Sequence, residues 1–208
     1  MNIYKFLLVD AALVIAAIPI LFLLQGGKKK YPLFSSSNKE KLLRKNSVKL
    51  PDKEKLIELE KLSKNQGSGI KFNSLVGDWK VISVWKKHID EEDLVFSSFL
   101  RIFAANIKFK KNLPTEYLPK FSVIASIQLG ALTIEFSGSG YLKGEQPLLT
   151  FFLNLIELKL GSKILLSRSL AEQDEKKKSF FSMIALEESG KWLSARVKGG
   201  ALVIWLKD

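Results

Sequence analysis

The 208-residue chain contains no cysteine and only one histidine. Without cysteine it can form no disulfide, offers no thiolate nucleophile and cannot bind zinc or iron through sulfur. The single histidine, His88, lies in the polar stretch Lys86–Asp90, which indicates a turn between the first two strands. One histidine cannot supply the several nitrogen ligands of a typical metal centre. We therefore expect no metal site, no cofactor and no redox chemistry by the side chains.

Catalytic motifs are also missing. The sequence has no His-Glu-x-x-His pair for a metalloprotease and no Gly-x-Ser-x-Gly turn for a hydrolase. The stretch Ser137–Gly140 lacks the Lys-Ser/Thr ending of a phosphate-binding loop, so it indicates a turn between strands. The charge runs Glu91–Asp93 and Asp174–Lys178 indicate solvated loops. We expect a protein that is not an enzyme.

Negative charge is scarce: 33 lysines and arginines stand against 21 acidic residues, which gives a net charge of +12. Such an excess favours an anionic partner, either nucleic acid or an anionic lipid surface. Residues 28–64 hold twelve basic and five acidic residues, so +7 of the total lies in this stretch. Because the stretch directly follows an apolar segment, the charge favours an anionic membrane surface and argues against nucleic acid.

Tyr4 to Leu24 form the one long apolar run, about twenty residues, which is the length that a helix needs to cross a bilayer. A cleaved secretory signal is the alternative, but the run is long for one and no small-x-small cleavage site follows it. Asp10 is costly within a span and would favour a partner helix in the membrane. Lysines follow the run, so we expect a single-pass protein of a thylakoid or plasma membrane, with its C-terminal domain cytoplasmic or stromal.

Three regions follow from this pattern: a transmembrane anchor over residues 1–27, a basic juxtamembrane linker with a short helix over 28–68, and a β-domain over 69–208. Tyr31–Asn38 indicates a linker, and Pro51 begins a helix with Leu56, Leu59 and Leu62 near one face. Gln66–Gly69 ends that helix.

Beyond Gly69, apolar and polar residues alternate, and turn residues recur every eight to fifteen positions. In the clearest case, Phe121, Val123, Ala125, Ile127 and Leu129 share one face of a strand. We count eight to nine strands, and no long helix interrupts them. The fold class is therefore mainly β, and closure of the strands into an antiparallel barrel would hide their edges.

Gly77-Asp78-Trp79 stands at the entry of the first strand. This opening resembles that of the lipocalins. The resemblance implies a tryptophan that plugs the closed end of the barrel beneath an arginine of the last strand, for which Arg196 is the candidate. A buried tryptophan at a strand start is also common in other β proteins.

The C-terminal run Trp192–Ile204, with Arg196 before a glycine turn and an apolar strand, resembles the closing motif of the plastid lipid-associated proteins, the fibrillins. Phe152–Gly161 is similar to the penultimate strand of that family. The family usually carries a second arginine where this chain has Leu193, and seldom a spanning helix. The resemblance implies a lipocalin-like barrel of thylakoid-type membranes that binds lipids or isoprenoids in a structural or photoprotective role, without catalytic residues.

An apolar cavity could hold such a ligand, which would enter from the bilayer. The same side chains could equally fill the barrel. In Phe99–Phe103, which we expect on a strand, Arg101 shares a face with the two phenylalanines and could pair with a polar ligand head or simply face outward. A non-binding assembly or scaffold subunit of a membrane complex remains the alternative function. The candidate lining residues are Trp85, Phe99, Arg101, Phe103, Phe121, Ile134 and Phe136.

Overall fold

The computed structural model describes residues 37–45, 47–87, 91–111, 121–144, 147–170 and 178–208. Its described helices are α2 (Ser37–Lys45), α3 (Lys53–Gln66), α4 (Phe72–Leu75) and α5 (Leu94–Ile102). Its described strands are β1 (Gly77–Trp85), β2 (Asn106–Lys111), β3 (Phe121–Leu129), β4 (Leu132–Lys143), β5 (Leu148–Leu160), β6 (Lys163–Ser169), β7 (Ser179–Leu186), β8 (Trp192–Val197) and β9 (Leu202–Lys207).

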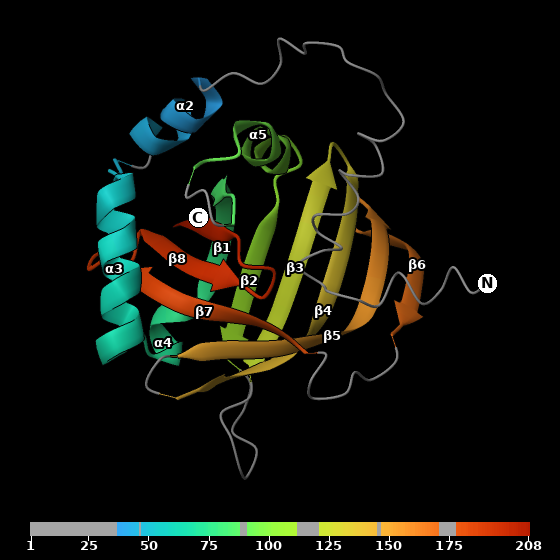
Figure 1. Ribbon diagram of the computed structural model, residues 1–208. Coiled ribbons are helices and arrows are strands. Elements are labelled where there is room, and N and C mark those ends of the chain that lie inside the picture. The colour runs from blue at the N-terminus through green and yellow to red at the C-terminus, as the bar shows by residue number, and fades with distance from the viewer. Residues whose placement is uncertain (1–36, 46, 88–90, 112–120, 145–146, 171–177) are drawn as a thin grey trace, which may run out of the picture.

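These nine described strands form one antiparallel sheet in the order β4-β3-β2-β1-β9-β8-β7-β5-β6 (Figure 1). A further pairing of β4 with β5 closes the sheet into a ring, and β6 lies outside that ring on β5. The prediction of a mainly β, antiparallel fold is confirmed. All of Phe152–Gly161 except Gly161 falls in β5, so four of the described strands follow it and it is not the penultimate strand here.

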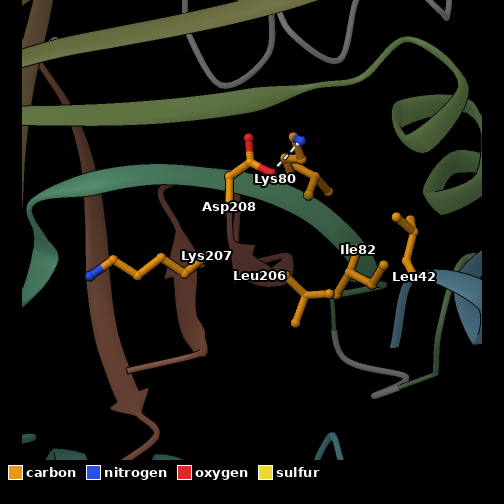
Figure 2. A pocket seen from close by; sticks show the side chains of 7 residues that line it. Leu42, Lys80, Ile82, Leu206, Lys207 and Asp208 are labelled. Carbon is orange, nitrogen blue, oxygen red and sulfur yellow. Dashed lines mark hydrogen bonds and ion pairs between the residues drawn. The ribbon is translucent and has the colours of Figure 1, made fainter. Parts of the chain in front are cut away.

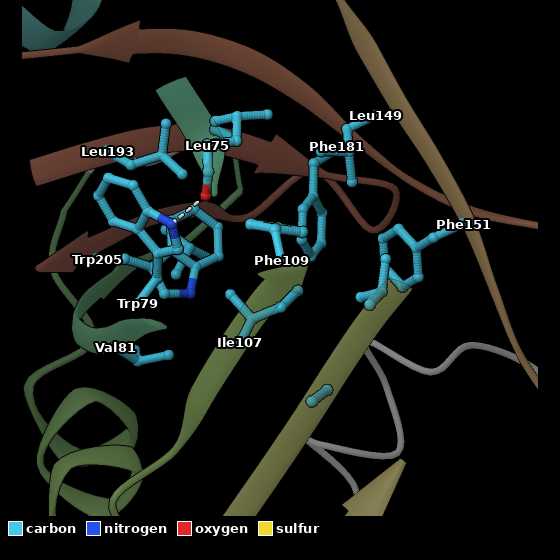
Figure 3. Close-up of a cluster of buried hydrophobic side chains, with 14 of the residues drawn as sticks. Leu75, Trp79, Val81, Ile107, Phe109, Leu149, Phe151, Phe181, Leu193 and Trp205 are labelled. Atoms are coloured by element: carbon cyan, nitrogen blue, oxygen red, sulfur yellow. Dashed lines mark hydrogen bonds between the residues drawn. The ribbon is translucent and has the colours of Figure 1, made fainter. Parts of the chain in front are cut away.

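The ring has a filled end next to α4. Trp79, Phe109, Phe151 and Phe181 are buried there in one cluster (Figure 3), to which Phe121 also belongs. Phe72 of α4 stacks on Phe121 with ring centroids 4.6 Å apart, so α4 covers this end. Strand alternation, which directs every second side chain inward, produces this core.

α3 forms where the sequence predicts a helix. The Asp52 side chain caps its first turn by accepting a hydrogen bond from the Lys55 N–H at 2.9 Å, and Gly67 ends the helix with φ of 78°. Leu56 packs on the outer face of the sheet against a second apolar cluster. The other buried members of that cluster are Ile82, Ile184, Trp192, Leu202, Ile204 and Leu206.

α5 corrects the sequence analysis, which placed Phe99–Phe103 on a strand; Phe99, Arg101 and Ile102 instead lie in a helix and Phe103 ends it. The Asp93 carboxylate caps this helix by accepting from the Phe96 N–H at 3.0 Å. The apolar run has neither a clear helical nor a clear strand period, so pattern alone could not identify it. α2 was not predicted at all, and it begins inside the expected linker.

Ser137–Gly140 is also corrected: it lies in the middle of β4 rather than in a turn. The register of β4 with β5 shifts between Ser137 and Gly138. A Cβ at Gly138 would come within 2.0 Å of the Phe152 carbonyl oxygen. Glycine is therefore present because the neighbouring strand approaches closely, not because the chain reverses.

The predicted membrane span, residues 4–24, lies outside the described residues. Within the described ranges, no helix is long and apolar enough to cross a membrane. His88 and residues 174–177 also fall outside them.

Candidate functional site

The inner face of the sheet continues past the core as a leucine-rich surface, which we call the apolar wall. In β3 and β4, Ala125 pairs with Phe136, Ile127 with Ile134 and Leu129 with Leu132. Cross-strand partners share a face, so these residues lie on the side of the buried Ala125 and Phe136. The same rows extend to β5 and β6 through the pairs Leu132–Leu160, Ile134–Leu158 and Leu158–Leu166.

Exposure rises along this face towards the end opposite α4. Ile127 is 8% exposed, whereas Leu132 is 38%, Leu160 is 50% and Leu166 is 59% exposed. These leucines lie on the same sheet face as the core yet remain open to solvent, so the described residues fill the ring at one end and leave this apolar face uncovered at the other. A contiguous apolar surface of this kind typically marks a binding site.

The outer face of the same strands is polar. The Lys159 Nζ atom lies 2.9 Å from a carboxylate oxygen of Glu135 and 3.0 Å from a carboxylate oxygen of Glu157. Hydrogen bonds from Lys159 to these carboxylates raise the pKa of its ammonium group above the usual value. The charged groups satisfy one another on the outside, which leaves the inside to apolar contacts.

Two backbone hydrogen bonds fix the geometry of the open end. The Gln128 N–H donates to the Phe103 carbonyl at 2.6 Å, which ties the end of β3 to the end of α5. The Gly161 N–H donates to the Ala131 carbonyl at 2.7 Å, which joins the β5–β6 turn to the β3–β4 turn. Figure 1 shows α5 and the end of β3 on the side of the ring away from α4.

The structure brings only some predicted lining residues together. Ile134 lies on the apolar wall, while Phe121 and Phe136 are buried in the core at its base. Phe103 packs against the same core from α5 and stacks with Phe99, with ring centroids 4.3 Å apart. Trp85 differs, because it packs against the outer apolar cluster with α3.

Arg101 is held by the protein itself. Its side chain is only 4% exposed and lies 3.7 Å from the Glu92 carboxylate, and Glu92 also binds Lys39 of α2 at 2.5 Å. Arg101 Nη1 donates to the Ile82 carbonyl at 2.5 Å and Nη2 donates to Ser98 Oγ at 2.8 Å. Burial lowers the pKa of this guanidinium, against the opposing effect of Glu92. These contacts join α2, α5 and β1, and Glu92 is not the solvated loop residue that we expected.

The cation over Trp79 is Lys207, not Arg196 as expected. Trp79 is fully buried, and its Nε1–H donates to the Leu75 carbonyl at 2.7 Å. Lys207 of the last strand pairs directly with Trp79, and its Nζ lies 5.3 Å from the ring centroid. A Cβ at Gly77, whose φ is 137°, would lie 2.9 Å from the Lys207 Cε. Gly77 therefore makes room for the lysine that crosses the indole.

Arg196 faces outward and fastens α3 to the sheet. Its neighbours Ala195 and Val197 pack towards the core, so Arg196 lies on the opposite side of β8. Arg196 Nε donates to both Glu60 oxygens at 3.1 Å, and Nη2 donates to Oε2 at 2.7 Å. Burial would raise the pKa of the Glu60 carboxyl, but hydrogen bonds from Arg196 and Lys64 outweigh it, so that pKa lies below its usual value.

A small hollow of about 50 Å³ lies outside the ring, between α2 and the β1–β9 pair (Figure 2). Leu42, Ile82 and Leu206 give it an apolar side, while Lys80 and Asp208 bind each other across its rim at 2.6 Å. The hollow holds little more than water, so it is no site for a lipid chain.

Sequence reasoning missed most of the apolar wall: Leu129, Leu132, Leu158, Leu160 and Leu166. Their alternation was visible, but only strand register reveals that leucines from four strands share one face. Among the described residues, no group of three His, Asp or Glu side chains could hold a metal ion. No protein-family model and no curated protein sequence matches the chain.

Proposed function

We propose that this chain is a membrane-tethered, lipocalin-like barrel protein that binds a lipid or isoprenoid on its apolar wall. The observation that carries the proposal is the row of leucines, 38% to 59% exposed, that continues the core face of the sheet beyond the buried residues. A membrane lipid or isoprenoid would cover such a row without needing hydrogen bonds from it. Arg101 would then be a structural residue and not a ligand for the polar head.

The membrane tether of the proposal rests on the apolar run from Tyr4 to Leu24 and on the basic residues after it. The resemblance to the fibrillins supports a lipid ligand and a photosynthetic membrane. The change from Arg196 to Lys207 at the indole departs from the expected pattern. It preserves the physical arrangement, a cation of the last strand over the first tryptophan.

The experiment is mass spectrometry of lipids that co-purify with the full chain from its native membrane. The test variant carries Leu132→Asn and Leu160→Asn, which are exposed enough to leave the fold intact. Two half-exposed leucines lose on the order of 2 kcal/mol of apolar contact, which weakens affinity about 30-fold. We expect one lipid class to be enriched with the wild-type chain and strongly depleted with the variant.

Leu148→Asn is the matched control, because Leu148 is also 38% exposed but lies at the start of β5, away from the open end. It should retain the lipid at the wild-type level. Equal lipid content in wild type and the double variant would contradict the proposal.

A second function, an assembly or scaffold subunit that binds no ligand, is favoured by the packing of the ring interior. At the α4 end, buried aromatic side chains already fill the interior of the ring, so a ligand has no space there. In this case the wall would contact a partner protein. Two results together would support this function: no lipid is enriched, and a photo-reactive residue that replaces Leu132 cross-links to another protein.

A further inference from the structure

Further exposed apolar side chains lie outside the wall, on α5 and β6 at the open end. We call this set the docking edge: Leu94, Val95 and Ile102 of α5 together with Ile164 and Leu165 of β6, which are 42% to 60% exposed. The hydrogen bonds from Gln128 to Phe103 and from Gly161 to Ala131 hold α5 and the β5–β6 turn at the same end. Three of these exposed residues belong to a helix and two to a strand, so the apolar surface extends over two elements.

We propose that the docking edge inserts into the interfacial layer of an anionic bilayer and so turns the open end of the ring towards the membrane. This inference rests on the membrane tether of the proposed function and adds an orientation to it. Apolar side chains at the headgroup boundary, combined with flanking basic residues, are the usual composition of an interfacial site.

The path of the chain supports this orientation. The chain enters the described domain at α2, which is fixed beside α5 by the ion pair between Lys39 and Glu92. Only residues 25–36 separate Ser37 from the expected span. Twelve residues reach at most about 45 Å when fully extended. The tether therefore joins the described domain at α2, beside α5 and the open end of the ring.

Charge favours a lipid surface over another apolar partner. From residue 25 to residue 45 the chain has seven basic residues (Lys28, Lys29, Lys30, Lys39, Lys41, Arg44 and Lys45) and one acidic residue, Glu40, which is a net charge of +6. Exposed Lys86 precedes α5 and lies 4.0 Å from Asp93, and exposed Lys163 begins β6 next to Ile164. Each such cation near an anionic leaflet adds to the attraction.

Docking in this way also gives the wall access to its ligand. The wall opens at the same end as the docking edge, so a lipid could pass from the bilayer to Leu132 and Leu160 without crossing water. The free-energy cost of exposing the lipid chain to water grows with each methylene group. A ring with its filled end towards the membrane would lose this advantage.

The test uses the absence of cysteine in the chain, which allows one environment-sensitive thiol probe per variant. Leu94→Cys and Ile164→Cys report on the docking edge, and Leu62→Cys is the control, because Leu62 is 41% exposed on α3. Each labelled full chain is reconstituted into phosphatidylcholine vesicles with and without phosphatidylglycerol. Lipids spin-labelled near the headgroup serve as quenchers.

We expect quenching and a blue shift at Leu94 and Ile164, at least about twofold stronger than at Leu62, and an increase with phosphatidylglycerol. Equal quenching at the three sites, or the strongest quenching at Leu62, would overturn the docking proposal. A blue shift that depends on protein concentration but not on spin-labelled lipid would overturn it in favour of a second copy of the chain.

The outcomes also separate this proposal from the proposed function. A chain that does not float with the vesicles would overturn the tether and the docking together. Floating chains that are unquenched at the docking edge, but still lose lipid on Leu132→Asn and Leu160→Asn, would overturn the docking alone.

Discussion

The indole of Trp79 and the ammonium group of Lys207 meet because two residues pair across β1 and β9. Trp79 is the more constrained partner: it is buried, and its N–H is already bound to Leu75. Lys207 is the exposed last residue of β9, so its stem can cross the indole while its ammonium group stays in contact with water. A lysine near the chain end gives no motif of its own, so only the strand register could identify it.

Replacing Lys207 with methionine keeps most of the stem but removes the charge over the indole. We expect the free energy of unfolding to fall by about 0.5 to 1 kcal/mol, the value of an exposed cation–π contact. Urea unfolding of the full chain in detergent, followed by tryptophan fluorescence, measures this loss. Lys110→Met on β2 is the control, since Lys110 is exposed on the strand surface. An equal loss in both variants would show that Lys207 makes no special contact.

Helices and strands were predicted most accurately from the sequence where one face of the element is buried and capping or turn residues stand at its ends. α3 has a capping aspartate and a terminal glycine, and β3 alternates without a break. α5 was missed because phenylalanine, leucine and valine favour strands as well as buried helices. α2 was missed because its short amphipathic pattern gains its apolar contacts only from the outer cluster, through Leu42 and Leu43.

Residue contacts between elements were harder to predict than the elements. The closing arginine, Arg196, was expected inside because a resemblance assigned it there. A side chain on β8 alternates with its neighbours, and Ala195 already occupies the inner face, so Arg196 had to face α3. The alternation along β8 could have predicted that Arg196 faces outward. Its partner could not be predicted in this way, because Glu60 lies 136 positions earlier in the chain.

The Glu60–Arg196 contact predicts that α3 docking depends on pH. The folded-state pKa of Glu60 lies below its unfolded value of about 4.3. Its contribution to stability is therefore complete above the unfolded pKa and is lost as pH falls through the folded pKa. We expect an added loss of stability below about pH 4, and faster exchange of α3 amide hydrogens, measured by hydrogen exchange with mass spectrometry.

Glu60→Gln separates this contact from the other carboxylates, because glutamine keeps the shape but not the charge. At neutral pH the variant should be less stable by about 2 kcal/mol, the range of hydrogen bonds to charged groups. Below pH 4 its stability should approach that of the wild type. An identical pH dependence of α3 exchange in both proteins would contradict a role for Glu60.

For the molecule as a whole, the two ends of the ring differ in composition and therefore in what they can do. The α4 end is dense with aromatic side chains and stabilises the fold. The α5 end exposes leucine and isoleucine on both the wall and the docking edge. Alternation in the sequence predicts a buried face on each strand. It does not predict which end of the ring is filled and which is open, because this depends on which strand ends meet α4 and which meet α5.

The final prediction concerns the membrane tether, because both proposals place the ring at a membrane. If the apolar run from Tyr4 to Leu24 spans the bilayer, the full chain should remain in the membrane after carbonate extraction. A chain that begins at Ser37 should be released, because interfacial contacts alone are reversible. Mass spectrometry of the mature N-terminus is the independent measurement. A terminus near residue 27 would identify a cleaved signal, and the ring would then reach a bilayer only through its docking edge.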